Sequence, residues 1–141
     1  FGPARDAGAG AGGGVGFALL AVLGAGRRSG IDAVLDLVDL DGALGDADLV
    51  VTGEGSLDAQ TLRGKAVAGV AERARARGVA VVAVCGRTAL SDEQARALGV
   101  RATYPLSALE PDRERSISRA ADLLRLTGHR IAGDWLSRPE V

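Results

Sequence analysis

Apolar residues follow two spacings along this chain, and the change from one spacing to the other marks its elements. Short, largely apolar runs occupy 48–52, 79–86 and 100–104, as is typical of strands buried in a parallel sheet. Residues 66–77 carry apolar positions three and four apart, which predicts an amphipathic helix between the first two strands. Ser91 and Gln94 form a capping-box pattern that predicts another helix, reaching about residue 98.

A last helix is predicted from Pro111 to about residue 136, so strands and helices alternate from residue 48 onward. Such alternation predicts an α/β fold with a parallel sheet, right-handed crossovers and helices on both faces, a Rossmann-like three-layer αβα unit. We expect residues 1–141 to form a single α/β unit. It comprises a glycine loop and helix at 8–24, a helix at 31–40 and a βαβαβα segment at 48–136.

The densest polar segment follows the first predicted strand, where the ligand crevice of an open parallel sheet is expected. It reads Val-Thr-Gly-Glu-Gly-Ser-Leu-Asp-Ala-Gln-Thr-Leu-Arg-Gly-Lys over residues 51–65, and residues 86–88 fall at the same edge. Glycines on both sides of Glu54 let the backbone turn sharply, and Asp58 adds a second carboxylate. One carboxylate can hold Mg²⁺ while the other accepts a proton from a hydroxyl nucleophile.

Lys65 is the one lysine among 17 basic residues, and Gly64-Lys65 places its ammonium at a predicted helix N-terminus. Positive charge is unfavourable there unless an anion binds nearby. Gln60 and Thr61 can orient the oxygens of a substrate. The alternative interpretation is a polar loop in which Asp58 or Thr61 caps the helix and Lys65 is solvated.

A second candidate site is the glycine run at residues 8–16, which an apolar stretch follows. A glycine loop that opens a helix lets backbone N–H groups approach an anion. The candidate phosphate or nucleotide contacts are therefore Gly8, Gly10, Gly12 and Gly13. Close packing of a small-residue helix explains the same glycines equally well, and both interpretations stay open.

Composition narrows the classes of partner. A net charge of −1 and a pI near 5.8 provide no basic surface for nucleic acid, and no apolar run reaches the ~18 residues of a membrane span. The single cysteine, Cys85, is interpreted as a small buried hydrophobe and suits a reducing cytoplasm. We interpret three acidic residues as a solvated face and a turn rather than a metal site: Asp36, Asp39 and Asp41.

The segment Val51-Thr52-Gly53-Glu54-Gly55, continued by Leu57-Asp58, Gln60-Thr61 and Gly64-Lys65, resembles the signature of the bacterial two-domain glycerate kinase I family. Residues 8–13 resemble that family's glycine loop, with Gly12 where the family typically has alanine. The likeness continues through Ala83-Val84-Cys85-Gly86 into the last predicted helix, so it covers nearly all 141 residues.

This resemblance implies ATP-dependent phosphorylation of D-glycerate to a phosphoglycerate, with Mg²⁺, in a cleft between two α/β domains. It implies that Glu54 and Asp58 are acidic site residues, either of which can contact Mg²⁺, and that Lys65 is an electrostatic clamp on substrate or transferred phosphoryl. The implied substrate contacts are Gln60, Thr61 and Gly64. Whether the 2- or the 3-hydroxyl of glycerate is phosphorylated stays open.

The likeness covers only the C-terminal part of the family's length, without its N-terminal strand and its intervening domain. We therefore expect weak or no kinase activity from this chain alone, and self-association through exposed sheet edges. Two other hypotheses stay open. The chain could be a non-catalytic half-domain that binds nucleotide or phosphate, or a structural fragment that docks on a partner chain.

Overall fold

The structure is a computed structural model that describes residues 8–63 and 65–136. Its backbone contacts divide the chain into two compact units, Phe1–Ala33 and Val34–Val141. The expectation that residues 1–141 form a single α/β unit stays a prediction.

The first unit carries the glycine run as a turn that leads into a 3₁₀ helix, η2 (Ala11–Gly14), and helix α1 (Val15–Ala21). Gly12 and Gly13 have φ angles of 60° and 68°, a left-handed backbone that residues with a Cβ rarely adopt. Helix α1 ends at Ala21 rather than at the predicted residue 24. Gly24 itself is left-handed, with φ of 60°, the conformation typical of a residue just beyond a helix.

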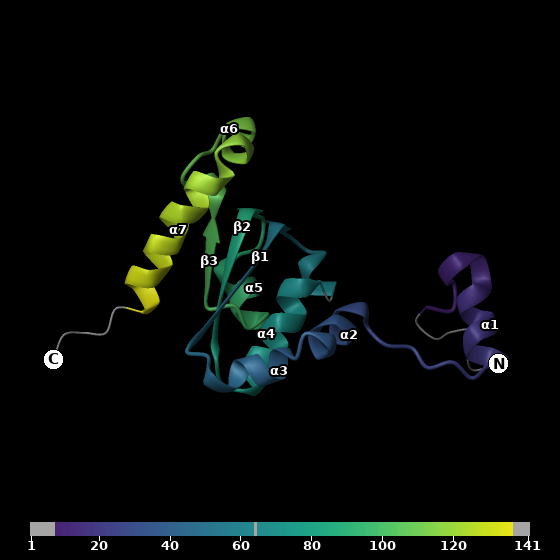
Figure 1. The fold of residues 1–141 in the computed structure, drawn as a ribbon. Helices are drawn as coiled ribbons and strands as arrows, with labels where there is room; N and C mark the ends of the chain where they lie inside the picture. The colour runs from purple at the N-terminus through teal and green to yellow at the C-terminus, as the bar shows by residue number, and fades with distance from the viewer. Residues whose placement is uncertain (1–7, 64, 137–141) are drawn as a thin grey trace. The chain divides into compact units, whose positions relative to one another are not determined.

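Within the described residues, the second unit is built on one parallel sheet with the order β1 (Leu49–Leu57), β2 (Ala80–Thr88), β3 (Ala102–Pro105). The sheet confirms the predicted parallel α/β fold (Figure 1). Strand β1 continues beyond its predicted end at residue 52. A Cβ on Gly53 would lie 2.3 Å from the Val84 carbonyl oxygen, so this glycine brings two strands close together instead of forming a turn.

Helices cover both faces of this sheet. Helices α4 (Ala66–Ala76) and α5 (Asp92–Ala97) lie over one face, and α7 (Ala120–Trp135) lies over the other (Figure 1). Val81 of β2 belongs to the core beneath α4 and α5, whereas the next residue, Val82, belongs to the core beneath α7. Consecutive strand residues thus face opposite helical layers, which confirms the three-layer arrangement.

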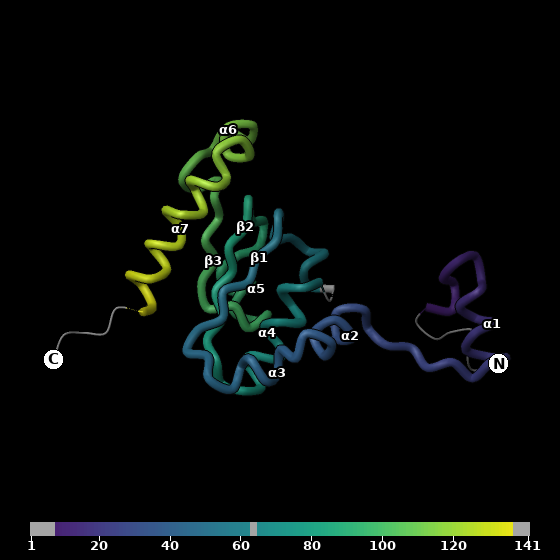
Figure 2. The backbone as a smooth tube through the Cα atoms, in the orientation of Figure 1, coloured from purple at the N-terminus to yellow at the C-terminus, as the bar shows by residue number. Residues whose placement is uncertain are grey.

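Two predicted helices are each broken into two. The helix expected at 31–40 is α2 (Gly30–Leu37) followed by α3 (Leu40–Ala43), because Asp39 between them is left-handed, with φ of 49°, and caps α3. The helix expected from Pro111 is α6 (Arg113–Ser118) and then α7. Figure 2 shows the backbone passing from β3 through α6 and then returning along α7.

Short 3₁₀ turns join the other elements: η3 (Leu44–Asp46), η4 (Thr61–Arg63) and η5 (Leu106–Ala108). The predicted capping box of Ser91 and Gln94 is confirmed at the start of α5, with both reciprocal hydrogen bonds present. In the part of the chain that the structure describes, no helix is both long enough and apolar enough to cross a membrane.

Candidate functional site

Polar side chains gather beyond the carboxyl end of β1, beside the start of α4. Glu54 lies near the end of β1, and its side chain is only 16% exposed. Its Oε1 accepts a hydrogen bond from the Thr61 hydroxyl, and its Oε2 lies 3.6 Å from Lys65 Nζ. Both oxygens of Glu54 are therefore engaged, and this carboxylate ties the strand to the beginning of the helix.

Asp58 and Thr61 shape the turn between β1 and α4. The Asp58 carbonyl accepts from Thr61 N–H at 2.9 Å, and Asp58 Oδ1 accepts from Gln60 N–H at 2.8 Å. Thr61 is fully buried, and its Oγ1 accepts from Asp58 N–H at 3.1 Å while it donates to Glu54. Thr61 is thus placed to hold the turn and the Glu54 carboxylate, whereas Gln60 is exposed to solvent.

Lys65 occupies the N-cap position of α4, where its positive charge opposes the helix dipole. Glu54 supplies the compensating anion from within the chain, and the Lys65 side chain is still 40% exposed. The alternative interpretation of this segment is therefore wrong in both parts: Asp58 supports the turn at Gln60 and does not cap α4, and Lys65 is paired with Glu54 as well as partly exposed. An ammonium held by one carboxylate and open to solvent can also bind an incoming phosphoryl group.

The ends of β1 and β2 become irregular at two glycines. Residues three apart in a regular strand face opposite sides of the sheet. Glu54 and Leu57 nevertheless lie on the same side, because Glu54 contacts the start of α4 and Leu57 is buried in the core beneath α4. The regular pairing of the two strands omits Gly55 and Gly86, and a Cβ on Gly86 would lie 2.7 Å from the Gly55 carbonyl oxygen. This close approach breaks the strict alternation and brings the next residue of each strand into a pocket.

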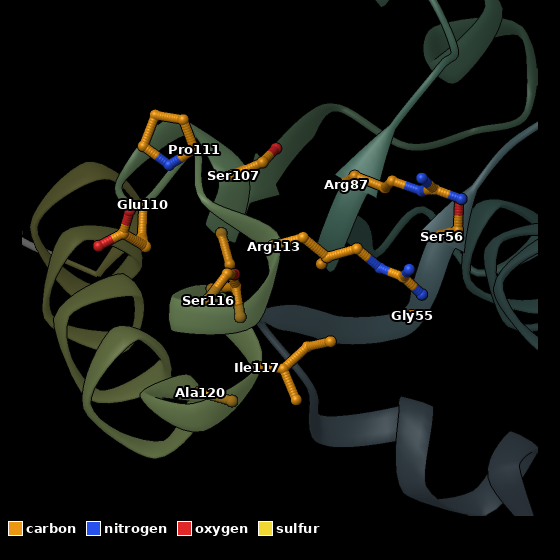
Figure 3. A pocket seen from close by; sticks show the side chains of 12 residues that line it. Gly55, Ser56, Arg87, Ser107, Glu110, Pro111, Arg113, Ser116, Ile117 and Ala120 are labelled. Carbon is orange, nitrogen blue, oxygen red and sulfur yellow. The ribbon is translucent and has the colours of Figure 1, made fainter.

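The pocket at this end of the sheet has a volume of about 640 Å³. Ser56 and Arg87 enter it from β1 and β2, and Arg87 Nε donates to Ser56 Oγ at 3.4 Å. Helix α6 contributes Arg113, which extends toward the same strand ends (Figure 3). The sequence placed residues 86–88 at this edge, but it gave no signal for Arg113, because only the return of the chain after β3 brings α6 there.

Several predicted site residues cannot be placed relative to this edge. Gly8, Gly10, Gly12 and Gly13 belong to the first unit, and their role as phosphate contacts stays a prediction. Gly64 lies outside the described residues. The roles predicted for the other site residues likewise stay predictions, although Glu54, Asp58, Thr61 and Lys65 are joined by the contacts described above.

Metal ligands are sparse in the described part of the chain, where no group of three or more His, Cys, Asp or Glu side chains could hold an ion. Asp36 and Asp41 are each 2.6 Å from the Arg73 guanidinium, and Asp39 accepts from Gly42 N–H. Asp36 and Asp41 therefore link α2 and α3 to Arg73 of α4, and Asp39 caps α3.

Cys85 is a buried thiol at the register position of β2 opposite Glu54. Burial, and then the negative charge of Glu54, raise the pKa of Cys85 to about 11. A thiol that stays protonated at neutral pH is a poor nucleophile. With 2% exposure, Cys85 is confirmed as a small buried hydrophobe.

The sequence model of the Glycerate kinase family matches residues 3–136. A glycerate kinase of Bacillus cereus is 38% identical over 128 residues, which are 91% of this chain and 34% of that protein. One from Neisseria meningitidis is 40% identical over 134 residues, 95% of this chain and 36% of that protein. A crystal structure from Salmonella typhimurium LT2, assigned there as a glycerate kinase 2, has a TM-score of 0.53 and 34% identity, covering 91% of this chain and 37% of its own. The chain thus spans about a third of the length of these relatives.

Proposed function

The chain belongs to the glycerate kinase family, and on this premise we propose that it serves the ATP-dependent phosphorylation of D-glycerate to a phosphoglycerate. The observation that carries the proposal is the ion pair at the carboxyl end of β1, in which a largely buried Glu54, 16% exposed, holds a partly exposed Lys65. An ammonium fixed in one position can stabilise the charge that develops on a transferred phosphoryl group. The names of the relatives support glycerate as the substrate.

In this reaction a glycerate hydroxyl oxygen attacks the terminal phosphorus of ATP, and the bond from that phosphorus to the ADP oxygen breaks. The hydroxyl proton must leave as the new bond forms. We assign its acceptance to Asp58, because Asp58 Oδ2 has no hydrogen-bond partner among the described residues, whereas both Glu54 oxygens are engaged. Glu54 holds Lys65 in place, and Lys65 neutralises the phosphoryl oxygens.

The proposal includes Mg²⁺, which in nucleotide sites is usually held by one or two carboxylates together with phosphates and water. A full set of protein ligands is therefore not required, and the described residues offer none. Glu54 fits this limited role because an ionised carboxylate has about four lone-pair sites, and among the described residues Oε2 is engaged only by the Lys65 ion pair. When bound, Mg²⁺ would neutralise charge on the ATP phosphates.

The remaining contacts belong to the same proposal. Gly12 and Gly13 have a left-handed backbone that a residue with a Cβ would adopt only with strain. Glycine at these positions is consistent with a loop whose main chain approaches phosphate. The buried free thiol of Cys85 is consistent with a reducing cytoplasm. Gly8, Gly10, Gly12 and Gly13 are the candidates for a phosphate contact in the first unit, and we assign glycerate to Gln60 and Gly64.

The test is release of ADP from ATP, Mg²⁺ and D-glycerate by the wild-type chain and by Lys65→Ala. We expect the substitution to lower kcat/KM by about 10²- to 10³-fold, the loss typical of removing one group that stabilises transition-state charge. Arg75→Ala is the matched control, because it removes one positive charge from an exposed position on α4. Measurable turnover that is equal in the wild type and a folded Lys65→Ala variant would contradict the assigned site.

Binding of ATP and of D-glycerate, measured by calorimetry, is the second readout, and it is informative even where turnover is slow. The prediction that this chain alone has weak or no activity is tested by the same assay. ATP binding without turnover, unchanged in Asp58→Asn, would favour the non-catalytic half-domain. A folded chain that binds neither ligand would favour docking on a partner chain.

A further inference from the structure

Two arginines of the pocket at the carboxyl end of the sheet have no acidic partner within the described residues. Arg87 donates to Ser56 Oγ at 3.4 Å, and Arg113 forms no ion pair there. Glu110 also lines the pocket, but its carboxylate is already engaged by the Arg119 guanidinium at 3.7 Å and by a backbone N–H at 3.2 Å. The pocket therefore presents two guanidinium groups whose charge the described residues leave unneutralised.

The floor of the pocket is bare main chain. Gly55 and Gly86 line it without side chains, and a Cβ placed on Gly55 would meet nothing within 4 Å. Figure 3 shows the side chains of Arg87 and Arg113 extending toward the Gly55–Ser56 stretch from two different elements. An anion on this floor can meet both guanidinium groups, whose planar forks match the geometry of phosphate oxygens.

We propose that this pocket binds the polyphosphate chain of a nucleoside triphosphate, an inference that rests on the proposed kinase function. Its volume of about 640 Å³ suits a nucleotide-sized ligand and exceeds what a three-carbon acid fills. Leu106, Pro111 and Ile117 provide an apolar wall that suits a base or a ribose.

The position of the pocket along the strand also favours the triphosphate. Gly55 directly follows Glu54, the residue whose carboxylate holds Lys65. A phosphate chain above Gly55 therefore lies one residue along β1 from the cluster assigned to phosphoryl transfer. The two arginines bind and orient the chain, and Lys65 is left to act on the group that is transferred.

The experiment measures dissociation constants by calorimetry for ATP, inorganic tripolyphosphate and D-glycerate. The variants are Arg87→Ala and Arg113→Ala, with Arg75→Ala as the control that removes the same charge outside the pocket. Both pocket arginines are exposed, and Asp112 still caps α6 when Arg113 is replaced, so the variants should fold. Their urea midpoints verify this.

We expect each pocket variant to bind ATP and tripolyphosphate about 10- to 100-fold more weakly, the range for one lost hydrogen bond to a charged group. D-glycerate binding, and all binding by Arg75→Ala, should match the wild type. Unchanged ATP affinity in both pocket variants would overturn the proposal, as would a folded wild type that binds no ATP. Weaker binding of D-glycerate alone would show that the pocket binds glycerate, and it would also overturn the proposal.

These outcomes are independent of the test of the proposed function. Phosphorylation that depends on Lys65, with ATP affinity unchanged in Arg87→Ala and Arg113→Ala, would support the proposed function and refute the proposed polyphosphate site. Arginine-dependent ATP binding without phosphorylation that depends on Lys65 would do the opposite.

Discussion

Replacing Thr61 by valine removes one buried hydroxyl and nearly preserves the shape of the side chain. Thr61 is fully buried, and its Oγ1 accepts from Asp58 N–H at 3.1 Å while donating to the Glu54 carboxylate. A neutral hydrogen bond contributes about 0.5–1.5 kcal/mol, and one to a charged group about 1.5–3 kcal/mol. Thr61→Val should therefore lower the free energy of unfolding by about 2–4 kcal/mol.

Urea unfolding followed by the fluorescence of Trp135, the single tryptophan, measures this loss. With a slope of about 2 kcal/mol per molar urea, the middle of the range for small proteins, the midpoint should fall by about 1–2 M. Thr61→Ser is the control, because it keeps the hydroxyl and loses only a methyl group, which costs about 0.8 kcal/mol. Serine should also preserve ADP release, whereas valine should reduce it by freeing Glu54.

Two results would refute this reasoning. A Thr61→Val variant that unfolds at the wild-type urea concentration would show that the two hydrogen bonds do not stabilise the turn. A loss of D-glycerate affinity without any loss of stability would show instead that Thr61 touches the substrate, as the resemblance implies.

Three further predictions test the packing of the sheet against its helices. Tyr104→Phe removes the hydroxyl that accepts from Trp135 Nε1–H at 2.8 Å. The free energy of unfolding in urea should fall by about 1–2 kcal/mol, and the tryptophan emission should change. An unchanged spectrum and an unchanged midpoint would contradict this. Gly53→Ala should destabilise by about 1–3 kcal/mol through overpacking against β2, whereas Gly55→Ala, with open space around its Cβ, should have little effect; equal losses would be inconsistent with the strand contact. Burial raises the pKa of Cys85 from 9.0 to about 11, so the unfolded state loses this proton at a lower pH than the folded state does. The stability of the wild type should therefore fall relative to that of Cys85→Ala as pH rises above 9, by about 1.4 kcal/mol at pH 10. Parallel pH profiles for the two proteins would count against a raised pKa.

The parallel sheet and its main helices could be predicted because local signals and tertiary structure agree there. Residues 80–85 of β2 form a continuous apolar run that two helical layers bury, and α4 buries Val67, Ala71 and Ala74 at the predicted spacing. The capping box at Ser91 depends only on residues within one turn. In such segments neighbours in sequence supply most of the contacts that decide the structure.

The ends of β1 and of α6 could not be predicted, because partners far along the chain decide them. Gly53 predicted a turn, yet the close approach to the Val84 carbonyl makes it part of a strand. Arg113 joins the pocket only because the chain returns after β3 (Figure 2). The pairing of Glu54 with Lys65 lies between these cases, since the sequence placed both residues at one edge but could not show that each engages the other.

Two features described above make the molecule a convenient host for optical probes. Its one native thiol is buried and stays protonated at neutral pH, so thiol-reactive dyes should not react with it under native conditions. A cysteine introduced at the pocket by Ser116→Cys would then accept a dye selectively, without first removing Cys85. Trp135 on α7 can serve as the energy-transfer donor, so ligand binding at the pocket becomes observable as a change in emission from an otherwise unmodified chain.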